Sequence, residues 1–424
     1  MSALKSIIEA NKAGQQAGIY SVCSAQPLVL RAALRHAARQ RAPLLIEATA
    51  NQVNQHGGYT GMTPADFIAF VKSLAQSEGV AEAQLLFGGD HLGPVAWKHL
   101  TAEQAMAEAE AMVRAYVEAG FCKIHLDASM ACHQEQTPLA DEVIAARAAR
   151  LCRAAEAAKA PGQQLCYVIG TEVPAPGGVS SLEEGLQVTP VAAMKHTISA
   201  HKQAFAAEGL GEEVWQRVIA LVVQPGVEFG NAGVHQYDDT LTKEQSRFIR
   251  EQPNLVFEAH STDYQLPEHY AQLVAGHFAI LKVGPQLTFA LREGLFALDH
   301  IEALLVPAAK RSGLRALCEQ KMLSEPKYWQ SFYTDPALRD WQLGFSYSDR
   351  IRYYWPELSL TIDKLLANLA NPIPEPLISQ YLPLAYPAVV RGELPATAIE
   401  LVLHHISLVL NRYASACQPA AIEG

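Results

Sequence analysis

The residues best suited to chemistry in this chain lie where short apolar runs end. Asp90 and His91 follow Gly88 and Gly89 directly after the run 85–87, so a carboxylate and an imidazole lie where glycine lets backbone approach a ligand closely. Other runs end in similar residues: Glu47 and Asn51; Lys123, His125 and Asp127; Glu172; Gln224; His260, Ser261 and Thr262; and Lys282 with Gly284. A turn capped by Asp90 explains its own motif equally well, but the repetition indicates a shared polar site.

A divalent metal is the expected centre of this site, and zinc is the expected ion. His91, Glu172 and His260 follow three different runs, and two imidazoles with a carboxylate form the donor set of an open catalytic metal site. Such an ion polarises a carbonyl group, while Asp90 or Asp127 would transfer a proton. We therefore predict catalytic roles for Asp90, Asp127 and Glu172.

A hydrogen-bonded polar cluster without a metal remains an alternative. Glu47 has a possible ion-pair partner in Lys123, and His125 has the position of a satisfied core imidazole. In the run 123–127, alternation places Lys123, His125 and Asp127 on one face of a strand. The two interpretations involve the same residues and differ in whether a metal ion is bound among them.

Eight apolar runs alternate with helix-like stretches, which predicts a (β/α)8 barrel with a C-terminal helical extension. The expected strands are 18–23, 43–48, 84–87, 122–126, 165–170, 217–223, 255–258 and 278–283, and the barrel is expected to occupy residues 1–305. An open doubly wound sheet would carry a glycine fingerprint after its first strand, and 21–25 has none. Residues 306–424 are aromatic, proline-broken and expected to pack on the barrel as helices.

Composition excludes several classes of protein. The chain has 424 residues, a formal net charge of −10 and a 50% hydrophobic content, which argue against binding nucleic acid or an anionic membrane. The N-terminus lacks the apolar core of a signal peptide, and no stretch has the length of a membrane span. Seven cysteines without a Cys-x-x-Cys pair fit a reducing, cytoplasmic location.

Ten stretches together closely resemble the GatZ/KbaZ family. They are 21–25, 45–49, 57–67, 88–94, 123–129, 168–174, 224–229, 258–265, 281–292 and 348–356. The resemblance implies a non-catalytic accessory subunit of class II D-tagatose-1,6-bisphosphate aldolase, which serves galactitol or N-acetylgalactosamine breakdown. The implied partner is the smaller catalytic barrel subunit, and a homo-oligomer is also possible.

The family is in turn similar to class II aldolases, and that likeness implies roles for individual residues. Asp90 and His91 match the proton-transfer carboxylate and the first metal ligand, Glu172 matches a glutamate, and His260 matches a second metal histidine. Where the likeness expects one more metal histidine, this chain has Gln224, a weaker donor. The phosphate group of a sugar phosphate would meet Ser261, Thr262, Gly284 and Thr288. The remaining expected substrate contacts are Ser24, Glu47, Asn51, His125 and Lys282.

Two functions therefore remain open from the sequence. One is the accessory subunit, which would stabilise and activate the catalytic subunit; the other is a metal-dependent ketose or sugar-phosphate aldolase or epimerase active on its own. A kinase is not expected, because no Gly-x-x-x-x-Gly-Lys-Ser/Thr loop is present. Arg350 and Arg352, which lie among aromatic residues, would bind a phosphate, pair with surface acids or form a protein interface.

Overall fold

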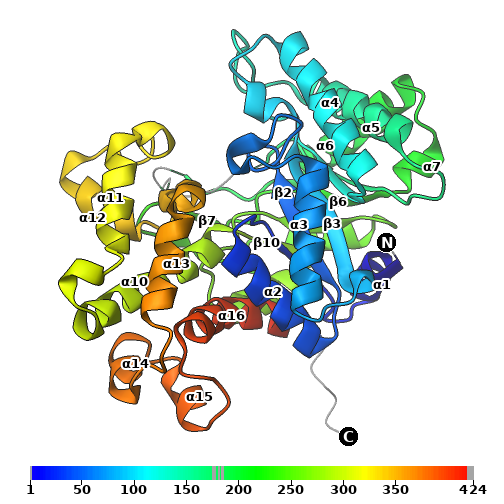
Figure 1. The fold of residues 1–424 in the computed structure, drawn as a ribbon. Helices are drawn as coiled ribbons and strands as arrows, with labels where there is room; N and C mark the ends of the chain where they lie inside the picture. The colour runs from blue at the N-terminus through cyan, green and yellow to red at the C-terminus, as the bar shows by residue number, and fades with distance from the viewer. Residues whose placement is uncertain (1, 174–177, 180–181, 183–185, 418–424) are drawn as a thin grey trace, which may run out of the picture.

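The computed structural model describes residues 2–173, 178–179, 182 and 186–417. Pro174, at the end of the stretch 168–174, and residues 418–424 of the expected extension lie outside the described residues. A closed parallel barrel in the order β1-β10-β9-β6-β5-β4-β3-β2 confirms the predicted (β/α)8 fold (Figure 1). Its strands are β1 Ile19–Val22, β2 Leu44–Thr49, β3 Leu85–Leu92, β4 Lys123–Leu126, β5 Cys166–Ile169, β6 Val218–Val222, β9 Val256–Ala259 and β10 Ile280–Val283.

Helices follow the strands because each parallel strand needs a crossover connection to return the chain. They are α2 Pro27–Gln40, α3 Pro64–Ser77, α4 Ala102–Ala119, α5 Asp141–Ala158, α6 Val191–Ala207, α7 Glu212–Trp215, α8 Lys243–Arg250, α9 Pro267–Ala275 and α10 Pro285–Leu305. One more helix, α1 Ser2–Lys12, precedes β1. A short antiparallel pair, β7 Glu228–Phe229 and β8 Val234–His235, follows β6. Thr63 and Asp66 form a capping box that fixes the start of α3.

The two ends of the barrel interior differ in chemistry. At the amino end of the strands, Leu4 and Ile8 of α1 pack in one apolar cluster with inward residues such as Leu45, Leu86 and Ile280. This packing closes the floor of the barrel with apolar side chains. Polar residues are therefore left to the carboxyl end, where active sites of such barrels lie.

The carboxyl end of β3 has an unusual backbone. Its register against β4 shifts between Gly89 and Leu92, and His91 has a positive φ of 48°. A Cβ at Gly88 would lie 2.5 Å from Glu47 Oε1, so glycine leaves room for the Glu47 carboxylate inside the barrel. Left-handed backbone at a non-glycine residue is maintained only where surrounding structure enforces it. The end of β3 thus holds His91 in a conformation that the strand alone would not favour.

The chain after α10 packs on the barrel as helices. They are α11 Leu314–Ser324, α12 Pro336–Phe345, the 3-10 turn η6 Arg350–Tyr353, α13 Ser359–Asn368, α14 Glu375–Tyr381, α15 Tyr386–Val390 and α16 Ala398–Cys417. Helix α16 runs beneath α2 and α10 in Figure 1 and contacts both. Its Tyr413 hydroxyl donates to the Thr262 carbonyl at 3.0 Å. No helix in the described part of the chain is long and apolar enough to span a membrane.

Candidate active site in the barrel mouth

Two buried lysines bind the carboxylates of three strands. Lys123 on β4 lies 2.6 Å from Glu47 Oε1 and 2.6 Å from Glu258 Oε2, and none of the three side chains is exposed. Lys282 on β10 contacts the other oxygen of Glu47 and lies 2.9 Å from Asp90 Oδ1. The pairing of Glu47 with Lys123, which the sequence left open, is therefore present. Glu258, whose partners the sequence did not identify, links β9 to this network.

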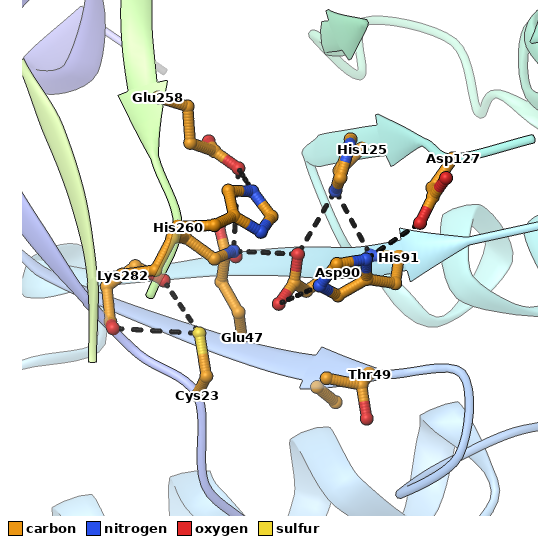
Figure 2. A network of polar contacts seen from close by, with 12 residues as sticks. Cys23, Glu47, Thr49, Asp90, His91, His125, Asp127, Glu258, His260 and Lys282 are labelled. Atoms are coloured by element: carbon orange, nitrogen blue, oxygen red, sulfur yellow. Dashed lines mark hydrogen bonds and ion pairs between the residues drawn. The ribbon is translucent and has the colours of Figure 1, made fainter. Parts of the chain in front are cut away.

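Three imidazoles surround Asp90 beside the lysines (Figure 2). The ring centroids of His91, His125 and His260 lie 4.9 to 5.2 Å from one another. His125 Nδ1 lies 3.1 Å from Asp90 Oδ1, and His260 Nε2 lies 3.0 Å from Glu258 Oε1. His91 Nδ1 lies 2.7 Å from Asp127 Oδ2. Each ring therefore has a carboxylate that fixes its orientation.

These contacts shift the pKa values of the buried groups in a consistent pattern. Burial opposes the charge of His91, but the carboxylates of Asp90 and Asp127 raise its pKa to about 9. Burial also opposes the charge of Asp90 and Asp127, yet the neighbouring imidazoles hold both pKa values well below the usual range. For His260 burial prevails and lowers the pKa. His91 is thus more disposed to carry a proton than His260.

The cluster fits a divalent cation. One donor atom each from Asp90, His125, Glu258 and His260 lies within 4.8 Å of the others. The His125 nitrogen that faces Asp90 is Nδ1, at 3.1 Å from Asp90 Oδ1, whereas the buried Nε2 has no hydrogen-bond partner among the described residues. Four buried carboxylates, those of Glu47, Asp90, Asp127 and Glu258, face two lysines and His91, whose pKa is raised, so the cluster keeps an excess of negative charge that favours a cation. The identity of such an ion is not fixed by these donors.

Two expected ligands lie elsewhere, which corrects the predicted donor set. Glu172 lies three residues beyond the end of β5, is exposed, and accepts a hydrogen bond from the Thr189 hydroxyl. Gln224 Oε1 accepts from the backbone amides of Gly226 at 2.8 Å and Val227 at 3.0 Å, which caps its own turn. Neither belongs to the donor group above. The structure brings His125 and Glu258 to His260 instead.

The predicted phosphate contacts are also arranged differently. Thr262 Oγ1 donates to the Lys282 carbonyl at 2.6 Å, and Thr288 Oγ1 donates to the Asp349 carboxylate, so both hydroxyls serve the fold. At the start of α10, Asp263 Oδ1 accepts from the amides of Gly284 at 3.1 Å and Gln286 at 2.8 Å. An internal carboxylate therefore fills the position where a phosphate was expected. Burial raises the pKa of Asp263 to about 6.

A cavity of about 530 Å³ opens above the cluster. Of the expected contacts, Ser24, Asn51, Ser261, Lys282, Gly284 and Thr288 line it, as do Asp90, His91 and His260. Glu47, His125 and Asp127 lie beneath this lining and contact its members. The extension contributes Arg352, Tyr353 and Trp355 to the wall. Cys23 and Asp263, which sequence reasoning missed, also line the cavity; Asp263 was recognisable as an acid near a strand end.

Comparison with known proteins supports a family assignment. The family model for D-tagatose-1,6-bisphosphate aldolase subunit GatZ/KbaZ-like matches residues 4–418. The crystal structure of a probable tagatose 6 phosphate kinase from Sinorhizobium meliloti 1021 is similar to this chain, with 48% identity and a TM-score of 0.87 over 94% of this chain and 100% of that one.

Two aldolase structures are more distant. The YdjI aldolase from Escherichia coli K12 has 9% identity over 84% of this chain and 97% of its own, with a TM-score of 0.43. Fructose-bisphosphate aldolase from Campylobacter jejuni has 11% identity over 85% and 94%, with a TM-score of 0.48. These values are too low to transfer a function. Because the family model spans residues 4–418, the protein belongs to the GatZ/KbaZ-like family.

Proposed function

We propose that this chain performs its own metal-dependent chemistry on a phosphorylated ketose, as an epimerase or an aldolase. The observation that carries the proposal is the buried ionic cluster of Glu47, Asp90, Lys123, Glu258 and Lys282 at the floor of an open cavity. Burying such charges costs several kcal/mol each, and apolar residues of similar size in their place would stabilise the barrel equally well. Binding a partner does not require such a network inside the barrel, whereas proton transfer to a ligand in the cavity does require charged groups there.

The residues of the cluster suit proton transfer at a carbonyl compound. A bound divalent ion would polarise the carbonyl of a ketose and stabilise negative charge on its oxygen. Asp90 lines the cavity as an ionised carboxylate and is the candidate proton acceptor. His91, which Asp127 orients, lines the same wall and is the candidate donor. Lys123 lies below and holds Glu47 and Glu258 in place.

Two reaction classes use these groups. In the first, the base removes a proton from the carbon next to the carbonyl, and return of a proton to the opposite face inverts that carbon. In the second, the base removes a hydroxyl proton two carbons from the carbonyl, the O–H electrons form a new carbonyl, and the carbon–carbon bond breaks. Rejoining the fragments on the other face gives an epimer, and their release gives aldol cleavage. Both classes place negative charge on the same ketose oxygen.

The second candidate is the accessory subunit of a D-tagatose-1,6-bisphosphate aldolase. The family description, which names an aldolase subunit, favours it. In that role the chain would bind the folded catalytic subunit and stabilise it by mass action. The pathway, galactitol or N-acetylgalactosamine breakdown, belongs to this candidate. The similar structure from Sinorhizobium meliloti is called a probable kinase, but this sequence has no phosphate-binding loop of that class, and we do not propose that activity.

Purified protein loaded with zinc or manganese separates the two candidates. We expect it to interconvert or cleave ketose phosphates such as D-tagatose 6-phosphate without any second subunit, followed by NMR of the sugar. His260→Ala should abolish turnover, whereas His56→Ala, which changes an exposed imidazole, should not. If the protein is inert toward the ketose panel yet raises the Tm or activity of the catalytic subunit, the accessory role is correct instead.

A further inference from the structure

The cavity contains one arginine that, unlike the other cations of its lining, has no ion-pair partner in the described part of the chain. Three lysine or arginine side chains line it: Arg31, Lys282 and Arg352. Arg31 Nε lies 2.8 Å from Glu78 Oε1, and Lys282 lies 2.9 Å from Asp90 Oδ1. Arg352 makes no ion pair with a carboxylate in the described part of the chain. Among these three cations of the lining it is therefore the one without a carboxylate in direct contact, and the charges of Asp349 and Asp263 reach it from further away.

Neutral oxygens hold the Arg352 guanidinium in place. Its Nη1 donates to the carbonyls of Ser348 at 2.5 Å and Asp349 at 3.3 Å, and its Nη2 donates to the Tyr353 hydroxyl at 3.0 Å. The guanidinium carbon also lies 4.7 Å from the centre of the Tyr353 ring. A guanidinium has five N–H donors, so these three bonds fix its direction and leave donors for a ligand.

The segment that carries Arg352 is fastened to the barrel. Ser346 and Ser348 donate through their hydroxyls to Asn231 Oδ1 at 3.0 and 2.7 Å, and Thr288 of α10 donates to the Asp349 carboxylate. The Tyr264 hydroxyl donates to the Tyr347 carbonyl at 2.8 Å. These bonds position Arg352 before any ligand arrives, which reduces the entropy lost on binding.

The start of α10, where a phosphate was expected, is closed to an anion. The amides of Gly284 and Gln286 at the start of α10 already bond Asp263 Oδ1. A phosphate there would have to displace a buried carboxylate, whereas at Arg352 it would meet a guanidinium that interacts with the Asp349 and Asp263 carboxylates only beyond ion-pair distance.

We infer that Arg352, supplied by the C-terminal extension, binds the phosphate group of the sugar ligand. The inference rests on the proposed function for the identity of the sugar. It assigns the extension a direct role in recognition, because a guanidinium presents two parallel N–H groups that match two phosphate oxygens. The sugar would then lie between Arg352 on one wall and the imidazole cluster on the floor.

Calorimetric titration of the full-length, metal-loaded protein tests this assignment with three probes: inorganic phosphate, D-tagatose 6-phosphate and D-tagatose. Arg352→Gln should weaken binding of the two phosphate compounds roughly 10- to 100-fold, since one charge-assisted pair is lost, and leave D-tagatose unchanged. Arg352→Lys, which keeps the charge but not the fork, should show a smaller loss. Arg31→Gln is the matched control: it removes a cavity arginine that Glu78 already neutralises, and we expect less than about a twofold change.

Several outcomes would overturn the assignment: no phosphate binding by the wild type, phosphate affinity in Arg352→Gln within about twofold of wild type, or an equal loss in Arg31→Gln. If Arg352→Gln fails to fold, Arg352→Lys provides the test. An Arg352→Lys variant that binds both phosphate compounds as tightly as the wild type would contradict a contact through two parallel N–H groups. Dependence of phosphate binding on Arg352 without any turnover of ketose phosphates would support this site while contradicting the proposed activity. Turnover of ketose phosphates that does not depend on Arg352 would support the proposed activity and contradict this phosphate site.

Discussion

Two parts of the barrel rim carry similar residues and use them differently. On β2, β3, β4, β9 and β10, charged side chains lie within the strands or directly after them, and they converge on one buried network. On β5 and β6, Glu172 and Gln224 lie two or three residues beyond the strand ends and satisfy local loop contacts. Position relative to the end of the strand separates the two groups.

The physical reason is the strand's period of two. Inside a strand, the pleat decides which side chains face the barrel interior, so Lys123 and His125 must point the same way. Beyond the strand the backbone is free to turn, and a polar side chain bonds the nearest amide or hydroxyl. A strand-end acid is therefore a safer candidate for the site when it lies inside the pleat.

The largest effect is expected from breaking the network on the convergent side. Lys123→Met leaves Glu47 and Glu258 buried without their shared cation, which should lower the free energy of unfolding by about 3–5 kcal/mol. Denaturant titration measures this loss. Lys5→Met is the control, because Lys5 and Glu9 are 76% and 65% exposed and their 3.8 Å pair should contribute less than about 1 kcal/mol. Equal losses in the two variants would show that the buried network has no special role in stability.

Metal binding should depend on the same side of the rim. His125→Ala and His260→Ala each remove an imidazole from the donor group, and we expect metal affinity to fall roughly 100-fold or more. Elemental analysis of dialysed protein and the rise in Tm on adding metal report the loss. Undiminished metal content in both variants would contradict an ion held by these imidazoles.

The sequence predicted the barrel well because its signal is repeated. All eight expected strands are present, and the alternation in 123–127 correctly placed Lys123, His125 and Asp127 together. The donor set was less predictable, because Glu172 and Gln224 lie beyond the ends of their strands and bond residues of their own loops. Asp263 was missed for a related reason: its partners, the amides of Gly284 and Gln286, lie about twenty residues further along the chain.

The buried carboxyl group of Asp263 should make the stability of the protein depend on pH. Burial raises its pKa from 3.8 to about 6, so between those values the folded protein holds a proton that the unfolded chain has released. Its contribution to stability is complete below pH 3.8 and is lost as the pH rises through 6. We expect the stability of wild type relative to Asp263→Asn to fall by at most about 3 kcal/mol between pH 4 and 7. A difference that does not change with pH in denaturant titrations would contradict this buried, protonated Asp263.

The smallest effect is expected at Glu172, and it tests the comparison most directly. Glu172→Gln keeps an oxygen that can accept from the Thr189 hydroxyl, and the side chain is exposed, so stability should change by less than about 0.5 kcal/mol. Metal content should also stay at the wild-type level, in contrast to His260→Ala. A loss of metal in Glu172→Gln would mean that this carboxylate contributes to the ion site after all. The division of the rim into a convergent and a locally satisfied part would then be wrong for β5.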